Sequence, residues 1–300
     1  MERGPAPLGA CKRASVFTKT AQHRVFLRLV SDSDPYPEEA NASGEIASSP
    51  REKPMGFFDH LEDLRWTLVK CVVAFLICAG LVGYFLHEFN DLLLWPLQKV
   101  QAEYPKAVID LGTTSIMEGF TVVIQMCVLG GLLLAAPFLL FFIGQFVSPA
   151  LTPRELRMVL PVCFAALILF LCGSVFSYYL LVPSTLRVSV EINEMFGFVM
   201  RWTPGSYYSL LTWLVLGVGA SFEFPLLIVL LIYMGVMTTA FLRKYRRHAI
   251  VVIFIIAAVV TPTPDPFTQC LFAAPLYLLY EVAIIAGRRI ERRREAAVHG

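Results

Sequence analysis

The acidic side chains of greatest chemical interest in this sequence lie beside or inside long apolar runs. Asp59, Glu62 and Asp63 crowd into the stretch Phe57–Arg65, directly ahead of the first such run. Apolar residues recur there at helical spacing, and the three acids fall away from the apolar face. The helix dipole favours one or two acids in a first turn, but it does not explain three acids on the basic side of a membrane. We therefore predict a short amphipathic helix at the membrane surface that forms half of a docking site for a positively charged peptide.

A fourth acid, Glu155, stands in a short connection between two apolar runs, shortly after Thr152 and Pro153. Thr152 as the cap and Pro153 in the first turn predict that a helix begins here. Two interpretations of Glu155 remain open. It is either the acid of a capping box or a second carboxylate of the peptide-binding site.

Glu223 lies near the middle of a long apolar run, two residues before Pro225. An ion at this depth costs a few kcal/mol, so such carboxylates usually face a cavity or a partner. Pro225 frees a backbone carbonyl nearby and adds a second polar feature. We predict a functional contact for Glu223, and a protonated carboxyl hydrogen-bonded inside the bundle is the alternative. A proton-coupled secondary transporter that uses Glu223 as its carrier is the rival functional hypothesis, and a purely structural scaffold is the second.

The sequence contains no nucleophile elbow, H-E-x-x-H motif, P-loop or dinucleotide-binding glycine pattern. Six of its seven cysteines lie inside apolar runs without metal-ligand spacing, as is typical of small buried hydrophobic residues. His60, His87 and His248 are isolated from one another. We expect no enzyme activity, no cofactor, no metal and no nucleic-acid partner.

The composition is that of a polytopic helical membrane protein, because 57% of the residues are hydrophobic and only 16% are charged. Several runs reach the roughly 20 residues that cross a bilayer. Six hydrophobic segments are predicted, at 66–86, 120–142, 159–182, 207–234, 249–260 and 267–286, with a helix around 88–100 and a surface helix within 183–206. The uncharged fifth run spans only about 18 Å at 1.5 Å per residue. We therefore expect the last two segments to form a tight hairpin of short spans.

The ends of the chain differ from this apolar core. Residues 1–54 are rich in Pro, Ser, Ala and charge, which predicts a disordered N-terminal extension. Its basic start is similar to a transit peptide, but we favour the alternative of an upstream start codon, with Met55 as the working start. The expected organisation is thus an extension at 1–54, a six-span core at 55–287 and a basic cytoplasmic tail at 288–300.

Basic residues are distributed unequally between the two sides of the predicted membrane. Fifteen Lys and Arg residues lie on the side of the two termini and the connections 148–157 and 235–247, and four lie on the other side. By the positive-inside rule, both termini face the cytoplasm. The stroma or matrix takes that place if the membrane is organellar.

Several motifs, in order along the chain, resemble those of the TatC family, the polytopic core of the twin-arginine (Sec-independent) protein translocase. They are Phe57–Arg65, Met117–Phe120, Pro137, Phe146–Leu151, Ser221–Pro225 and Thr261–Gln269. The resemblance covers about 56–289. It implies an all-α polytopic fold with six transmembrane helices in a cup-like bundle, the last two short.

The resemblance also implies a function and its residues. Signal peptides that carry paired arginines, on folded cargo, would dock on the cytoplasmic face and be passed on with single-span TatA/TatB-type subunits. The expected membrane is the bacterial inner membrane, and the expected assembly is a homo-oligomer within a larger complex in the lipid bilayer. The residues that match family positions are Asp63, Glu155, Phe146, Glu62 and Arg65 for the signal peptide, Glu223 and Gln269 for intramembrane polar contacts with partners, and Pro96 and Asp265 as structural motif positions.

This sequence departs from the family pattern at two places. Asp63 stands where the family usually has Glu, one methylene longer. Arg154-Glu155-Leu156-Arg157 replaces the usual His-Glu-Arg-Arg, and Arg154 would repel an arginine ligand. The detailed docking geometry is therefore expected to differ from that of the family.

Overall fold

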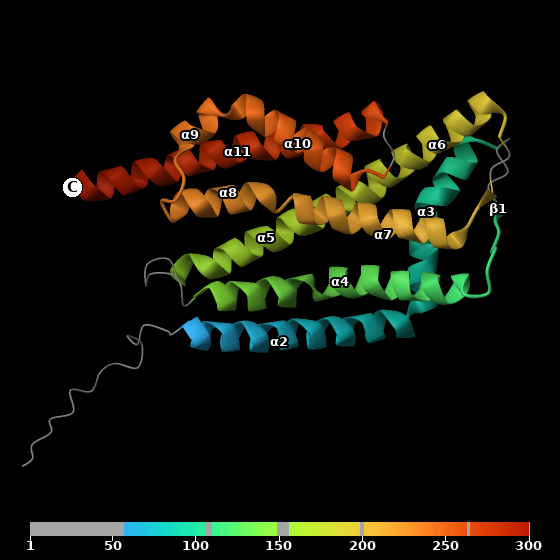
Figure 1. The fold of residues 1–300 in the computed structure, drawn as a ribbon, viewed down its shortest axis with the longest axis horizontal. Coiled ribbons are helices and arrows are strands. Elements are labelled where there is room, and N and C mark those ends of the chain that lie inside the picture. Colours follow the sequence, from blue (N-terminus) through green and yellow to red (C-terminus); the bar gives the residue numbers. More distant parts are fainter. Residues whose placement is uncertain (1–56, 106–109, 149–155, 199–200, 263–264, 300) are drawn as a thin grey trace, which may run out of the picture. The chain divides into compact units, whose positions relative to one another are not determined.

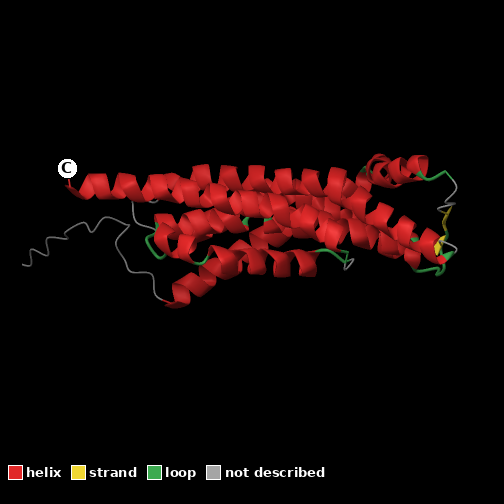
Figure 2. Ribbon diagram, turned by 90° about the horizontal axis from the view of Figure 1, so that it is seen from above, coloured by secondary structure: helices red, strands yellow, loops and turns green. Residues whose placement is uncertain are grey.

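The computed structural model describes residues 57–105, 110–148, 156–198, 201–262 and 265–299. The predicted N-terminal extension and Glu155 lie outside these residues. The long elements are helices, and most of them run alongside one another in both views (Figures 1 and 2). Five of them are long and apolar enough to cross a membrane, at His60–Tyr84, Glu118–Val147, Val159–Phe196, Pro204–Tyr233 and Pro266–Arg293. The chain is an integral membrane protein.

Helices α2 (Phe57–Tyr84) and α4 (Glu118–Val147) pack side by side. The amphipathic helix that the acidic stretch predicts forms the first turns of α2. No Gly or Pro interrupts the chain between that stretch and the apolar run, so the helical hydrogen bonds continue. Small residues let the two backbones approach, and a Cβ added at Gly131 would lie 3.0 Å from Ala79 Cα.

Helix α3 (Leu86–Glu103) crosses one end of the bundle (Figure 1). It contains Pro96, which is buried and has no N–H for the carbonyl of Leu92, four residues earlier. The Tyr178 hydroxyl donates to that carbonyl instead. One residue on, Tyr207 Oη donates to the Leu93 carbonyl at 2.5 Å. Two tyrosines from distant segments thus hold the proline-containing turn of α3.

The third span is longer than predicted. Helix α5 (Leu156–Phe176) passes through a π-helical turn, Ser177–Leu181, into α6 (Val182–Phe196) without a break. The predicted surface helix is therefore the continuation of the span. It ends where Gly197 adopts the left-handed conformation, with φ of 70°.

The fourth predicted span is two helices, α7 (Pro204–Ser221) and α8 (Phe224–Tyr233). The break falls at Glu223, directly before the turn in which Pro225 opens α8. Thr203 caps α7, since its Oγ1 accepts from the Ser206 N–H.

The C-terminal part consists of α9 (Thr239–Lys244), α10 (Arg246–Val260) and α11 (Pro266–His299). As predicted, α10 is short, about 22 Å at 1.5 Å per residue. Helix α11 continues past the predicted end of the apolar segment, so the described part of the basic tail is helical. Asp265 caps α11 as expected, because its Oδ2 accepts from the Thr268 N–H at 2.7 Å.

Two short strands, which the sequence analysis did not predict, join connections at one end of the bundle. Strand β1 (Asp110–Leu111) pairs in parallel with β2 (Arg201–Trp202), with Asp110 opposite Arg201. This end also carries α3 and α6 (Figure 1). The other end gathers the start of α2, the end of α4, the start of α5, α9 and the end of α11 (Figure 1). The segments predicted to share the basic side therefore lie at one end.

Candidate functional site

The end of the bundle with the basic segments also contains the predicted peptide-binding residues. Phe146, in the last turn of α4, stacks on His60, in the first turn of α2, with ring centroids 4.6 Å apart and planes 19° apart. Phe146 is helical because α4 continues to Val147.

Two acids of α2, Glu62 and Asp63, follow His60 within one helical turn. Asp63 lies one helical turn after His60 and is half-buried, whereas Glu62 and Arg65 are exposed. In the described part of the chain, neither Glu62 nor Asp63 forms an ion pair. Carboxylates without a cation are free to bind one from outside.

Glu155 belongs to the connection that leaves α4 just after Phe146 and enters α5 at Leu156. This connection lies outside the described residues. The helices at its two ends pack against each other, and α4 also packs against α2. The structure thus places Phe146 against His60, which lies one helical turn before Asp63.

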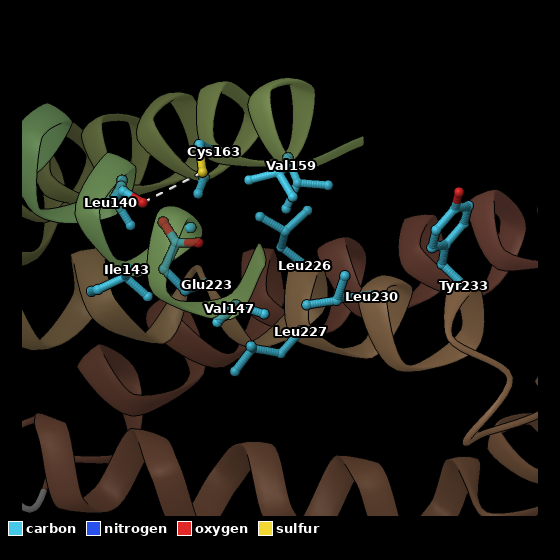
Figure 3. A pocket seen from close by; sticks show the side chains of 13 residues that line it. Leu140, Ile143, Val147, Val159, Cys163, Glu223, Leu226, Leu227, Leu230 and Tyr233 are labelled. Carbon is cyan, nitrogen blue, oxygen red and sulfur yellow. Dashed lines mark hydrogen bonds between the residues drawn. The ribbon is translucent and has the colours of Figure 1, made fainter. Parts of the chain in front are cut away.

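Glu223 faces an apolar cavity of about 250 Å³ between α4, α5 and α8. Its carboxylate points toward Leu140 of α4 and Cys163 of α5 (Figure 3). Glu223 Oε1 is buried and has no hydrogen-bond partner among the described residues. The alternative of a carboxyl hydrogen-bonded within the bundle is therefore not observed for this oxygen. A buried carboxyl without a partner is costly and marks a position where a polar group can bind.

The cavity reaches toward the end of the bundle that carries the basic segments. Val147, the last residue of α4, and Val159, near the start of α5, both line it. Val147 directly follows Phe146. The cavity therefore begins one residue from the His60–Phe146 contact.

The remaining predicted positions have structural contacts. Gln269 Nε2 donates to the Phe254 carbonyl at 3.0 Å and so joins α11 to α10. Pro96 lies in the tyrosine-held turn of α3, and Asp265 caps α11. Among the described residues, no group of three or more His, Cys, Asp or Glu side chains is placed to hold a metal ion.

The sequence analysis missed the role of Glu118, which it quoted only as part of a motif. At the far end of the bundle, Glu118 Oε2 accepts from the Thr114 N–H at 2.9 Å, and Oε1 accepts from the Gly205 N–H at 3.1 Å. The carboxylate thus joins the start of α4 to the start of α7. An acid in a first turn was the only available signal, and it does not identify a partner so distant in the sequence.

The fold and these side chains define a polytopic helical membrane protein whose basic end carries Glu62 and Asp63, two carboxylates that form no ion pair with any described residue. The family model of the Sec-independent protein translocase protein (TatC) matches residues 59–275. The chain belongs to the TatC family and is thus a membrane subunit of the Sec-independent protein translocase, a transport protein.

Individual relatives and solved structures agree with this membership. The TatC protein of Koribacter versatilis is 35% identical over 256 residues, which cover 81% of this chain and 91% of the relative. That of Aquifex aeolicus is 32% identical over 246 residues, with 80% and 98% covered. A crystal structure of a twin-arginine translocase receptor, TatC, has 31% sequence identity and a TM-score of 0.66, and the match covers 76% of this chain and 99% of that one. The predicted all-α polytopic fold class is confirmed.

Proposed function

We propose that the basic end of the bundle binds the paired-arginine signal peptide of folded cargo proteins. The observation that carries the proposal is the His60–Phe146 contact, which holds the start of α2, with its acids, against the last turn of α4. Asp63 and Glu155 would pair with the two arginines, and Glu62 would add negative potential. Phe146 and Arg65 complete the set of residues proposed for the signal peptide. Positive-inside counting then assigns this end to the cytoplasm, with the bacterial inner membrane as the favoured location.

The ion pairs alone are too weak to hold a peptide. Exposed pairs contribute about 0.2–1 kcal/mol each, whereas micromolar binding needs about 8 kcal/mol. The apolar part of the signal must supply the remainder. The cavity between α4, α5 and α8 has the matching chemistry, because it is apolar and begins beside Phe146.

A photo-crosslinker at Leu61 tests the proposed peptide site. Joint substitution of Asp63→Ala and Glu155→Ala should abolish crosslinking to a signal peptide whose export fails when its arginines are changed to lysines. Glu88→Ala with Asp91→Ala removes the same two acid types from exposed positions in α3, and should leave crosslinking intact. Undiminished crosslinking and export in the Asp63/Glu155 variant would refute the peptide site, and tolerance of Asp63→Lys with Glu155→Lys would favour a structural scaffold.

Glu223 is proposed to contact a polar group on a single-span TatA/TatB-type partner helix within the membrane. The unpartnered Oε1 supports this assignment. Copurification of the partner should fall with Glu223→Leu and Glu223→Ala and be retained in part with Glu223→Gln, which keeps one oxygen. Ser174→Ala is the control, because Ser174 Oγ is also a buried polar atom without a partner among the described residues. Copurification that survives both Glu223 removals would exclude the contact.

The rival hypothesis is a proton-coupled transporter with Glu223 as its carrier. It predicts that the chain alone drives solute flux in liposomes with an imposed pH gradient. The translocase proposal predicts no such flux without partners, because cargo transport would need the complete assembly.

A further inference from the structure

Six exposed cations form a basic surface at the end of the bundle where α11 leaves the core. The cations of this basic surface are Arg243, Lys244 and Arg247 on α9 and α10, and Arg289, Arg292 and Arg293 on α11. In the part of the chain that the structure describes, none of them forms an ion pair. Figure 1 shows α9 and the start of α10 lying beside α11 at this end.

Two acids of α11 beside the basic surface are already engaged. Glu291 accepts from the Thr239 N–H at 2.8 Å and from the Thr239 hydroxyl, which fixes the start of α9 to α11. Glu281 pairs with Arg246 at 2.8 Å, which fixes the start of α10 to α11. These two acids therefore hold the helices together, and among the described side chains they form no ion pair with the six cations.

The basic surface lies where exposed apolar residues give way to charge on both helices. On α10, Arg247 is followed within one turn by Val251, which is 58% exposed. On α11, Ile285, which is 51% exposed, is followed within one turn by Arg289. The lipid headgroups lie at the level where apolar side chains exposed to acyl chains are followed, one turn further out, by cations.

Aromatic side chains accompany the cations at this level. Phe241 and Tyr245 are both exposed, and their ring centroids lie 4.5 Å apart. Lys244 Nζ lies 5.8 Å from the centre of the Tyr245 ring. Aromatic rings of this kind favour the membrane–water boundary, which positions the cations of α9 against phosphate groups.

We propose that the basic surface binds anionic phospholipids, with the phosphate and headgroup against the cations of α9–α11 and the acyl chains along the exposed apolar faces of α10 and α11. Charge complementarity selects an anionic lipid over a zwitterionic one. The continuous apolar face distinguishes a lipid from free phosphate, which would use only the cations. Each basic group near an anionic surface contributes about fivefold in affinity.

Competitive lipid binding to the purified full-length chain tests the proposal. The protein in detergent is incubated with equal amounts of phosphatidylglycerol and phosphatidylcholine, and bound lipid is counted by native mass spectrometry. Lys244→Gln with Arg247→Gln should lower the ratio of bound phosphatidylglycerol to phosphatidylcholine by roughly twentyfold. Lys99→Gln with Arg201→Gln removes one Lys and one Arg from exposed positions at the opposite end and should leave the ratio within about twofold.

Several outcomes would overturn the lipid site. One is an unchanged ratio in the Lys244/Arg247 variant, and another is an equal loss in the control variant. Displacement of the lipid by excess inorganic phosphate would indicate a simple anion site, and displacement by polyglutamate would indicate a surface for acidic peptides. Retention of lipid against both competitors, together with loss in the Lys244/Arg247 variant alone, is the supporting result. Both variants must elute as one symmetrical peak on size exclusion. If the Lys244/Arg247 variant does not, the charge-conserving pair Lys244→Arg with Arg247→Lys takes its place and should retain the selectivity for phosphatidylglycerol.

Discussion

Phe146 stacks on His60 and thereby joins the end of α4 to the start of α2, with ring centroids 4.6 Å apart. Stacked aromatic pairs contribute about 0.5–1.5 kcal/mol beyond their buried area. The contact lies beside the proposed signal-peptide acids, so it should stabilise both the fold and the site.

A double-mutant cycle measures this contact. His60→Leu and Phe146→Leu, alone and together, should give a coupling free energy of unfolding of about 0.5–1.5 kcal/mol, measured by denaturant titration in detergent. Pairing His60→Leu with Phe138→Leu, on an exposed part of α4, should give no coupling. Signal-peptide crosslinking should fall in each single His60 or Phe146 variant, and full crosslinking in both would separate the aromatic pair from peptide binding.

The close approach of α2 and α4 predicts a strong effect at Gly131. A side chain there meets Ala79, because an added Cβ would lie 2.9 Å from Ala79 Cβ. Gly131→Val should destabilise the protein by about 1–3 kcal/mol through overpacking, read from the denaturation midpoint. Gly80→Ala is the matched control, since a Cβ there meets nothing within 4 Å. Equal stability of the Gly131→Val and wild-type proteins would contradict the close packing.

The bonds of Glu118 predict a graded loss of thermal stability. Glu118→Ala removes the acceptor for both the Thr114 and Gly205 N–H groups, so the unfolding temperature should fall. Glu118→Gln retains one acceptor oxygen and should lie between Ala and wild type. Glu88→Gln, at an exposed acid in the first turn of α3, should change little. Indistinguishable Gln and Ala variants would argue against two separate bonds.

Tyr104 should ionise at a higher pH than an ordinary tyrosine. Tyr104 Oη donates to Glu191 at 2.8 Å, and this bond, more than any other cause, raises the pKa of Tyr104 above its ordinary value of 10. Because the folded-state pKa is raised, the contribution of this bond to stability is complete below pH 10. It is lost as the pH rises through the raised value.

Difference absorbance titration of the wild type against Tyr104→Phe isolates this tyrosine. In the Glu191→Gln background the pKa of Tyr104 should move down toward 10, since the carboxylate no longer opposes ionisation. A pKa of Tyr104 that does not move in the Glu191→Gln background would show that the bond to Glu191 does not form.

Local patterns were sufficient to predict several features from the sequence. The long apolar helices, the short α10 and the cap at Asp265 all follow from residue type and helical spacing within a few neighbouring residues. Among the described residues five helices, not the predicted six, are long and apolar enough to cross a membrane. The predicted ends of the helices were less accurate. Helix α6 continues α5, and α11 continues into the basic tail, although the predicted apolar segments had already ended.

The sequence by itself determined which segments enter the membrane, which ends carry charge and which acids are expensive to bury, because each of these depends on the chemistry of one short segment. Only the tertiary structure decided that Tyr178 donates to the carbonyl freed by Pro96, that His60 meets Phe146 and that Glu118 joins α4 to α7. These contacts join residues far apart along the chain. Their partners are chosen by how whole helices pack, and no local periodicity encodes that choice.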